Sequence, residues 1–343
     1  MPTISVVLAA YRGEKYIGEQ LRSLFAQTRL PDEILIGDDS PDDATRRAIA
    51  DVLPEKPASV QLEVIVNPQQ LGHLKNFENL CAQAGGDFIF FCDQDDVWLP
   101  EKIATLSAVL ANHSDKMLAF GDSIRADATL TKFYDRLLLL SEDNAETEVA
   151  AFNNGNAFAR VLRGKLWLSL HNVAIRREFR DVILPVPSGY SYFDLWLNFI
   201  AAFYETSYCV NRVLTHYRVH ANNASAPSLL GGQRTAFGRL MLLIRRIIEI
   251  ARHGTEAEYR QIYEMSTALR ERLVAASAKL SLPDSQRCRN EELLNATGEF
   301  YRRRMEVIKQ PRYRRLPEIW RLRNNYPRFV PARWRSMLRD LLG

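Results

Sequence analysis

The stretch that decides the fold is Phe88–Pro100, which reads FIFFCDQDDVWLP. It opens with five apolar residues, the pattern of a strand buried in a parallel sheet. The strand ends in three carboxylates within four positions, and Pro100 then begins an amphipathic helix. Open α/β sheets bind ligands at the carboxyl ends of their strands, where carboxylates suit a hard cation such as Mg²⁺ or Mn²⁺. An acidic turn that only caps the next helix has the same composition.

Similar strand–helix units precede this stretch. We expect strands over Ile4–Ala9, Glu33–Gly37 and Leu62–Val66, each followed by a helix with one apolar stripe. Short connections join them, so the sequence predicts a Rossmann-like α/β fold: a mostly parallel sheet with right-handed crossovers, flanked by helices. Further strands are expected over Met117–Phe120 and Arg212–Tyr217.

Polar residues follow three of these strands and are therefore expected at one edge of the sheet. They are Tyr11 and Glu14 after the first strand, Asp38 and Asp39 after the second, and Asp93, Asp95 and Asp96 after the fourth. Carboxylates can accept hydrogen bonds from a pyrimidine N3–H or from ribose hydroxyls, and a tyrosine can lie against a base. The Gly-rich fingerprints of dinucleotide and P-loop sites are missing from the sequence, which argues against a dehydrogenase or a nucleotidyltransferase.

The ordered set SVVLAAYR (5–12), GDDS (37–40) and DQDDVW (93–98) resembles glycosyltransferase family 2 over about residues 3–220. The resemblance implies the GT-A fold and an inverting, metal-dependent enzyme with a nucleotide-sugar donor. The form CDQDDVW is most similar to the rhamnosyltransferase-like branch that builds bacterial O-antigen and capsule. The chain departs from the family pattern at Arg12, where many members have Asn, and at Ser40–Asp42.

The resemblance also implies roles for single residues. The base would be held by Ala9, Tyr11 and Asp39 beside Asp38, the ribose by Glu14 and Asp93, and the metal by Asp95 with Asp93. Asp96 would hold the turn.

Asp194 is the expected catalytic base. It opens an apolar helix at the position where the family has its base, although Phe193 replaces the usual polar neighbour. Inverting transfer needs one carboxylate that deprotonates the acceptor hydroxyl as it attacks the anomeric carbon. The alternative, purely structural interpretation is that Asp194 only caps its helix.

The segment Tyr217–Asn223 resembles the family's YRxHxxN motif. His220 is the candidate for a further metal ligand, and a histidine ligand favours Mn²⁺ over Mg²⁺. Arg218 is expected to neutralise diphosphate charge. His216 is expected to be structural, since it points away from Tyr217's face of the strand.

The rear of the chain differs from the front in charge. Residues 229–343 carry 24 Lys and Arg against 12 Asp and Glu, whereas residues 1–228 carry 21 against 29. We expect a GT-A catalytic domain over 1–225, in which residues 1–122 bind the nucleotide and residues 123–225 the acceptor, and a helical basic region over 229–343.

The basic region has two possible roles. Apolar residues at 240–250 and interleaved Arg and aromatic residues suggest either a solvated helical hairpin or a surface for anionic lipid, with Trp320, Trp334 and Leu342 at the interface. Nucleic acid is not expected as a partner, because the front half would repel phosphates.

The chain has no apolar run long enough to cross a membrane and no signal peptide ahead of its first strand, and its four cysteines form no CxxC pair. We therefore expect a cytoplasmic protein, peripheral on the inner face of the bacterial membrane. The predicted function is transfer of a sugar, with dTDP-rhamnose as the first donor, to a glycan or lipid-linked oligosaccharide acceptor. The alternatives are a UDP-hexose donor, and a catalytically silent GT-A module that tethers an assembly complex.

Overall fold

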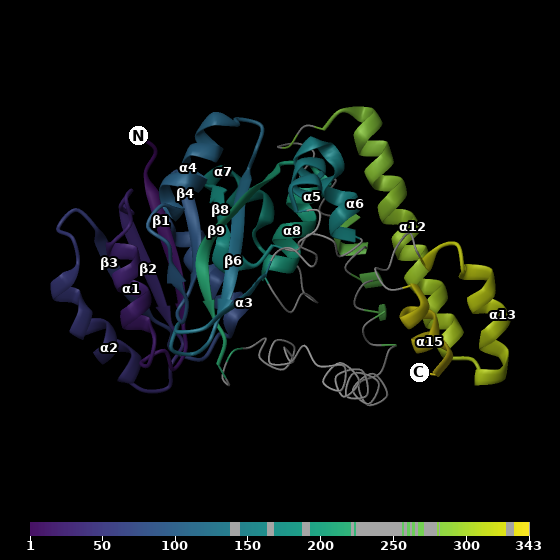
Figure 1. The fold of residues 1–343 in the computed structure, drawn as a ribbon, viewed down its shortest axis with the longest axis horizontal. Coiled ribbons are helices and arrows are strands. Elements are labelled where there is room, and N and C mark those ends of the chain that lie inside the picture. The colour runs from purple at the N-terminus through teal and green to yellow at the C-terminus, as the bar shows by residue number, and fades with distance from the viewer. Residues whose placement is uncertain are drawn as a thin grey trace. The chain divides into compact units, whose positions relative to one another are not determined.

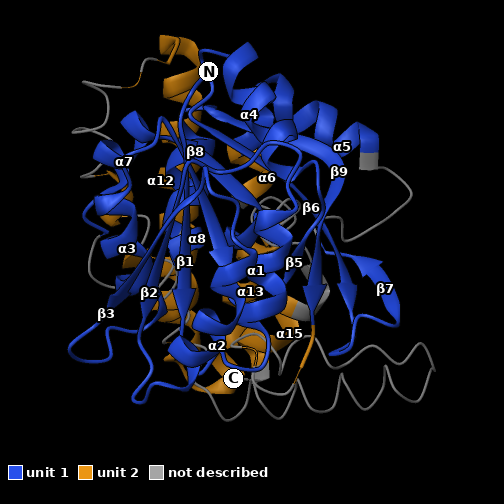
Figure 2. Ribbon diagram, turned by 90° about the vertical axis from the view of Figure 1, so that its left-hand side faces the viewer, with its two compact units in different colours: residues 1–157, 166–218 blue, residues 158–165, 219–343 orange. Residues whose placement is uncertain are grey.

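The computed structural model describes residues 1–137, 145–162, 168–186, 193–220, 223, 256, 259–260, 263–264, 267–270, 280, 282–326 and 333–342. The chain divides into two compact units, which Figure 2 shows in different colours. The first unit holds residues 1–157 and 166–218, and the second holds residues 158–165 and 219–343. The apolar segment 240–250, which the sequence places on a basic helical surface, lies outside the described residues.

One sheet forms the centre of the first unit (Figure 1). Its strands lie in the order β3-β2-β1-β4-β8-β6-β9-β5, and β7 pairs with β6. The bounds are β1 Ile4–Ala10, β2 Glu33–Asp38, β3 Gln61–Val66, β4 Phe88–Asp93, β5 Val97–Trp98, β6 Leu118–Ala126, β7 Phe133–Arg136, β8 Val173–Arg176 and β9 Ser207–Arg218.

The first four strands are parallel, as the sequence predicts. The rest of the sheet is mixed: β8 runs antiparallel to both β4 and β6, whereas β9 is parallel to β6. The expectation of a mostly parallel sheet therefore holds only for the first half. The α/β architecture of a sheet flanked by helices, with a helical region after it, is confirmed.

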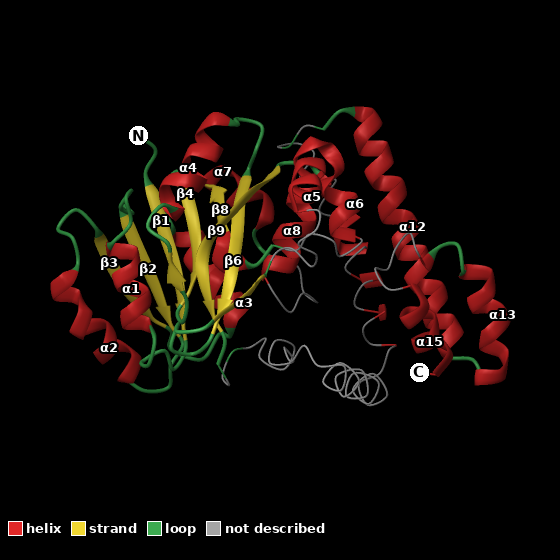
Figure 3. Cartoon of the chain, viewed as in Figure 1, coloured by secondary structure: helices red, strands yellow, loops and turns green. Residues whose placement is uncertain are grey.

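Helices cover both faces of the sheet (Figure 3). They are α1 Ile17–Phe25, α2 Ala44–Val52, α3 His73–Gln83, α4 Lys102–Asn112, α5 Ala145–Ala151, α7 Arg177–Ile183 and α8 Phe193–Phe203, with short turns η1 Leu53–Glu55, η3 Phe152–Asn156 and η4 Leu170–Asn172. Helix α6 Ala157–Leu162 belongs to the second unit except for its first residue.

Alternation along the strands explains the two faces. Side chains of β1, β2 and β4 at every second position, such as Val6, Ile34 and Phe90, join buried residues of α1, α2 and α4 in one core. The opposite face of β4 presents Phe91, whose ring lies 5.9 Å from Phe77 of α3 and 5.4 Å from Phe193 of α8. Both faces of this central strand are thus buried, which accounts for its continuous apolar run.

In the second unit, the described helices are chiefly α12 Asp284–Ile308, α13 Arg312–Leu322 and α15 Arg333–Leu342 (Figure 1). Their apolar residues form a separate core that includes Phe300, Ile319 and Met337. None of the described helices in either unit is both long and apolar enough to cross a membrane.

Candidate functional site

The strand register brings the predicted polar residues to one edge of the sheet. Ala9 of β1 is level with Gly37 of β2 and with Asp93 of β4, and Ala10 is level with Asp38. Because these strands are parallel, the segments that follow them leave the sheet on the same side. The sheet therefore gathers Tyr11, Asp39 and the DQDD turn at its carboxyl edge.

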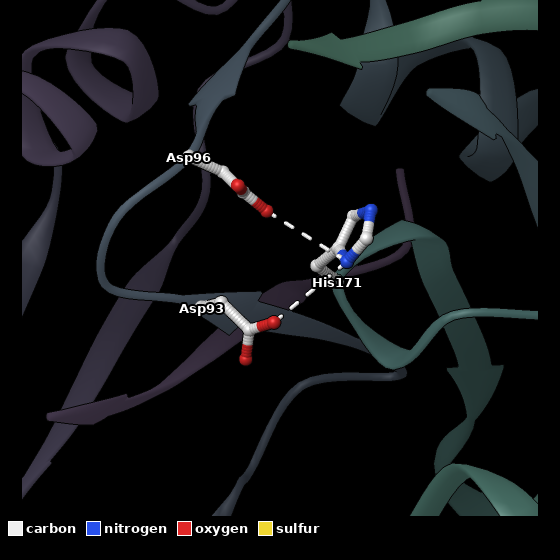
Figure 4. A group of neighbouring side chains, drawn as sticks. All are labelled: Asp93, Asp96 and His171. Carbon is white, nitrogen blue, oxygen red and sulfur yellow. Dashed lines mark ion pairs between the residues drawn. The ribbon is translucent and has the colours of Figure 1, made fainter. Parts of the chain in front are cut away.

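Two carboxylates and one imidazole lie together at this edge: Asp96 and His171 are buried and Asp93 is partly exposed. Asp93, Asp96 and His171 each offer one ligand atom, and the three atoms lie within 4.8 Å of one another (Figure 4). His171 Nδ1 is 3.7 Å from Asp93 Oδ2 and 3.7 Å from Asp96 Oδ2. Atoms that bind one divalent cation at about 2.1 Å lie up to about 4.2 Å apart, so the spacing is close to that of a metal site.

Asp96 is a buried carboxylate whose two oxygens differ in their hydrogen bonding. Its side chain is fully buried, Oδ1 accepts the backbone N–H of Arg218 at 3.1 Å, and Oδ2 has no hydrogen-bond partner among the residues that the structure describes. Burial, together with the charges of Asp95 and Asp93, raises the pKa of Asp96 well above its usual range. A cation beside Oδ2 would remove this penalty, so the residues present fit a divalent metal.

His171 is held in place by a chain of buried polar groups. Its Nε2 lies 2.7 Å from Ser123 Oγ, which also accepts a hydrogen bond from Asn172. Thr215 Oγ1 donates to Asn172 Oδ1, and Lys102 Nζ donates to Thr215 Oγ1. When Nε2–H is donated to Ser123, the lone pair of Nδ1 faces the two acids, which is how metal-binding histidines are usually oriented.

Lys102 is the buried cation behind the acids. Burial lowers its pKa to about 7, and the negative charges of Asp96 and Asp93 oppose that shift only in part. Its ammonium nitrogen lies 3.7 Å from the centroid of the Trp98 ring. At neutral pH this side chain therefore offsets only part of the charge of the acidic group.

A second histidine joins the group from α3. His73 Nε2 lies 3.6 Å from Asp93 Oδ1. Burial lowers the pKa of His73, but the Asp93 carboxylate outweighs that effect and raises it, with smaller contributions from Asp194 and Asp95. The negative charges of Asp194 and Asp95 therefore act on the same imidazole as Asp93 does. Asp194 comes from the first turn of α8, and α8 packs against α3.

The side chain of Gln94 connects the turn after β1 to the acidic turn after β4 through hydrogen bonds. Its side-chain Oε1 accepts the backbone N–H of Tyr11 at 2.8 Å, and its Nε2 donates to the Tyr11 carbonyl at 2.9 Å. Gly13 leaves room for this contact, because a Cβ there would lie 2.2 Å from Gln94 Oε1. Tyr11 itself is exposed, and Arg12 adopts a left-handed φ of 50°, a conformation that asparagine tolerates better.

The two acids after β2 make contacts within the protein. Asp38 is buried and pairs with Arg46 at 2.7 Å. Asp39 accepts hydrogen bonds from the backbone N–H groups of Leu71 and Gly72 and from the side chain of Asn67. Asp39 thus fixes the loop before α3, while its predicted contact with a base stays a prediction.

Glu14 follows β1 and is exposed. Its carboxylate lies 3.5 Å from Thr45 Oγ1, and its predicted contact with a ribose stays a prediction.

Arg218 braces the acidic turn. Its guanidinium is almost fully buried, donates to the Asp95 and Ala128 carbonyls, and pairs with Glu19 at 2.6 Å. His220 lies in the second unit, where its backbone N–H donates to Asn223 Oδ1. The predicted roles of Arg218 at a diphosphate and of His220 and Asp95 at a metal stay predictions.

Part of the chain is similar to a known protein family. Residues 5–160 match the model of the family described as Glycosyl transferase family 2. The matched stretch is 156 of the 343 residues, a little under half of the chain, and it is similar to that family. The similarity supports a glycosyltransferase enzyme, and the matched stretch contains Asp93 and Asp96 but ends before His171 and Asp194.

Among relatives, an uncharacterized glycosyltransferase of Nostoc is 26% identical over 236 residues, 67% of this chain and 69% of the relative. A dTDP-rhamnosyl transferase of Shigella flexneri, RfbG, is 34% identical over 99 residues, 28% of this chain and 34% of its own length. The second match spans only about a third of the relative, so it does not establish the rhamnosyltransferase branch.

Two solved structures support the fold. TarS 1–349 of Staphylococcus aureus, in complex with UDP-GlcNAc, has a TM-score of 0.53 at 14% identity and covers 95% of this chain and 81% of its own. The mannosyltransferase PcManGT of Pyrobaculum calidifontis, in complex with GDP-Man and Mn²⁺, has a TM-score of 0.52 at 17% identity, with coverages of 87% and 79%.

Proposed function

We propose that the protein is an inverting, divalent-metal-dependent glycosyltransferase that uses a nucleotide-sugar donor. The observation that carries the proposal is the buried Oδ2 of Asp96, which finds no hydrogen-bond partner in the described part of the chain and lies 3.7 Å from His171 Nδ1. A buried carboxylate in that position is costly unless a cation completes its surroundings. It also lies in the domain that matches the family and at the edge where open α/β sheets bind ligands.

Asp93 and Asp96, with Nδ1 of His171, would hold the metal. Asp95 and His220 are the further candidate ligands. When bound, a divalent cation at this edge would neutralise charge on the diphosphate as it leaves. The chain's own contribution is the orientation of the ligands: Ser123 fixes the His171 ring, and the backbone N–H of Arg218 fixes Asp96.

Asp194 is the proposed general base. Its carboxylate takes the proton of the acceptor hydroxyl as that oxygen forms a bond to the anomeric carbon. The bond from that carbon to the diphosphate oxygen breaks, and its electron pair leaves with the nucleoside diphosphate. His73 lies 3.6 Å from Asp93, and the charge of Asp194 contributes to the raised pKa of this imidazole.

The donor is proposed to be dTDP-rhamnose, with a UDP-hexose as the alternative. The RfbG match and the CDQDDVW form favour the first. The complex of TarS with UDP-GlcNAc supports a nucleotide-sugar donor without favouring either nucleotide. The proposed acceptor is a growing surface glycan or a lipid-linked oligosaccharide.

The test is a donor screen on the full-length protein. Binding of UDP, dTDP and GDP sugars is measured by calorimetry with and without Mn²⁺, and Mn²⁺ binding alone is followed by the electron paramagnetic resonance signal of the free ion. We expect Asp96→Asn and His171→Gln each to weaken Mn²⁺ binding by at least about tenfold. Release of nucleoside diphosphate should fall in parallel.

His113→Gln is the matched control, because His113 lies just after α4 and stacks on Tyr208 instead of facing an acid. Mn²⁺ binding that is unchanged in both site variants would contradict the metal assignment. Metal and donor binding without any turnover, across the donor panel and a panel of glycan acceptors, would favour the catalytically silent module.

A further inference from the structure

The helix α13 has two sides of opposite character. One side is fixed inside the second unit: Ile319 and Leu322 are buried, and Arg315 donates to the Ile308 and Gln310 carbonyls at the end of α12. The Arg315 guanidinium also reaches the Asp340 carbonyl of α15. These contacts set the rotation of α13 and determine which side chains face outward.

The outward side carries a stripe of large apolar side chains. Tyr313, Leu316 and Trp320 are 76%, 60% and 61% exposed. Their spacing of three and then four residues places them on one face of the helix. Large apolar residues scattered singly on a surface need no explanation, but a stripe of three on one short helix indicates a binding surface.

Arginines border this stripe on both sides. At about 3.6 residues per turn, Arg312 and Arg323 fall on one flank of the stripe, and Arg314 and Arg321 fall on the other. The Arg323 guanidinium lies 4.9 Å from the Trp320 ring centroid, and that of Arg314 lies 5.6 Å from the Tyr313 ring centroid. The helix itself carries four Arg and one Glu.

The charges of α13 differ from those of α12 in their partners. On α12, Arg302 and Arg303 pair with Glu299, and Arg287 pairs with Asp284. On α13, Arg321 pairs with Glu318, whereas Arg312 and Arg314 have no acidic partner among the described residues, so their charge is available beside the exposed apolar stripe.

We propose that this face of α13, defined by Tyr313, Leu316 and Trp320 with Arg312 and Arg314, binds the surface of a bilayer that contains anionic phospholipid. Tyrosine and tryptophan favour the level of the headgroups, and arginine stems can lie along apolar surface while the guanidinium reaches phosphate. The helix has 11 residues, so it lies on the bilayer instead of crossing it. A nucleic acid is disfavoured because residues 1–228 carry 29 acids against 21 bases.

The test is co-sedimentation of the full-length protein with vesicles, in the absence of donor and metal. We expect binding to phosphatidylcholine vesicles with about 30 mol % phosphatidylglycerol and little binding to pure phosphatidylcholine. Binding should weaken as NaCl rises from about 0.05 M to about 0.5 M, since salt screens exposed charges. Arg312→Glu with Arg314→Glu should lower the partition coefficient by at least about tenfold, and Trp320→Ser should lower it in all vesicles that bind.

Arg287→Glu with Arg289→Glu on α12 is the matched control, with the same change in charge on exposed positions of the same unit. Equal loss in the control pair would show that only net charge matters and would overturn the assignment to α13. So would salt-independent binding, equal binding to pure phosphatidylcholine, or a loss of self-association in Trp320→Ser without a change in vesicle binding. Donor binding is measured separately, so this proposal and the proposed function can fail independently.

Discussion

Two buried polar clusters, one in each unit, are built on different principles. At the sheet edge, Asp93 and Asp96 lie beside His171, and no described residue donates a hydrogen bond to Asp96 Oδ2. In the helical unit, Asp340 accepts hydrogen bonds from Tyr259 and Tyr326 and pairs with Arg304 at 2.7 Å. The Arg304 guanidinium also lies 4.1 Å from the Tyr259 ring centroid.

The two clusters differ in how their carboxylates are compensated. Both oxygens of Asp340 have donors and Arg304 pairs with them, although Arg304 Nη1 is buried without a hydrogen-bond partner among the described residues. The effect of the Asp340 cluster is on the stability of the helical unit. At the sheet edge, burial and the charges of Asp95 and Asp93 disfavour the charged form of Asp96, and the proposed cation would favour it. The two clusters should therefore respond in opposite ways to the loss of a carboxylate.

The largest expected effect is on turnover at the sheet edge. Asp194→Asn removes the proposed base and should lower kcat by about 10²–10⁴-fold, the usual contribution of general base catalysis. The melting temperature should change much less than kcat, because Asn is nearly isosteric with Asp and Asp194 is only partly buried. Steady-state release of nucleoside diphosphate measures the first quantity and differential scanning fluorimetry the second. Asp181→Asn, an exposed acid at the end of α7, should leave kcat unchanged; equal activity of both variants would refute the assignment.

The next effect is on the stability of the helical unit. Asp340→Ala leaves Arg304 buried without its carboxylate and should reduce the free energy of unfolding of this unit by about 3–5 kcal/mol. Hydrogen exchange should accelerate in α12 and α15 but not in β1 or β4. The double variant Arg304→Met with Asp340→Leu should recover much of the loss, since a packed apolar pair avoids the unpaired charge. Unchanged exchange in Asp340→Ala would show that the cluster does not stabilise the unit.

The sequence reveals much of the parallel half of the sheet. Each of its strands is a short apolar run with a breaker after it, and the residue that ends each run is polar, so Tyr11, Asp39 and Asp93 can be placed at one edge without coordinates. The last expected strand begins at Arg212, whereas β9 begins at Ser207. The first part of β9 is missed because the polar residues Asn211 and Arg212 separate it from the apolar residues that follow. The expected strand at Met117–Phe120 extends to Ala126 for a similar reason.

His171 and His73 cannot be recognised as parts of the site from the sequence. In a purely parallel sheet, the residues before a strand lie at the edge opposite the acids. Because β8 runs antiparallel to β4, with Phe90 level with Ala174, the residues before β8 instead lie beside Asp93. The direction of a strand depends on tertiary pairing, and the four residues of β8 carry no local signal for it. His73 follows Gly72 at the start of α3, and the hydrogen bonds from that loop to Asp39 bring it to the edge.

A smaller effect is expected at the turn that joins the acids to Tyr11. Gln94→Ala removes two hydrogen bonds to the Tyr11 backbone and should raise the KM for the donor by about tenfold, with a much smaller change in kcat. The physical reason is that Tyr11 would no longer be held in place against the proposed nucleotide. Gln83→Ala on α3 removes an exposed glutamine that bonds only to Asn79, and it should leave KM unchanged. A fall in kcat with constant KM would instead indicate that Gln94 positions the acids.

The smallest expected effect is on the free energy of unfolding, and it distinguishes the two clusters most directly. Loss of the Asp96 carboxylate should raise this free energy, whereas loss of the Asp340 carboxylate should lower it. In buffer with a chelator, Asp96→Asn should raise the free energy of unfolding by about 1 kcal/mol, since a buried carboxylate beside Asp93 and Asp95 is replaced by a neutral amide. Added Mn²⁺ should stabilise the wild type in proportion to its occupancy and should stabilise the variant far less, so the order of the two melting temperatures reverses. Asp340→Asn in the helical unit should destabilise under both conditions. If Asp96→Asn destabilised the metal-free protein as well, Asp96 would be a structural carboxylate like Asp340, and the contrast between the two clusters would not hold.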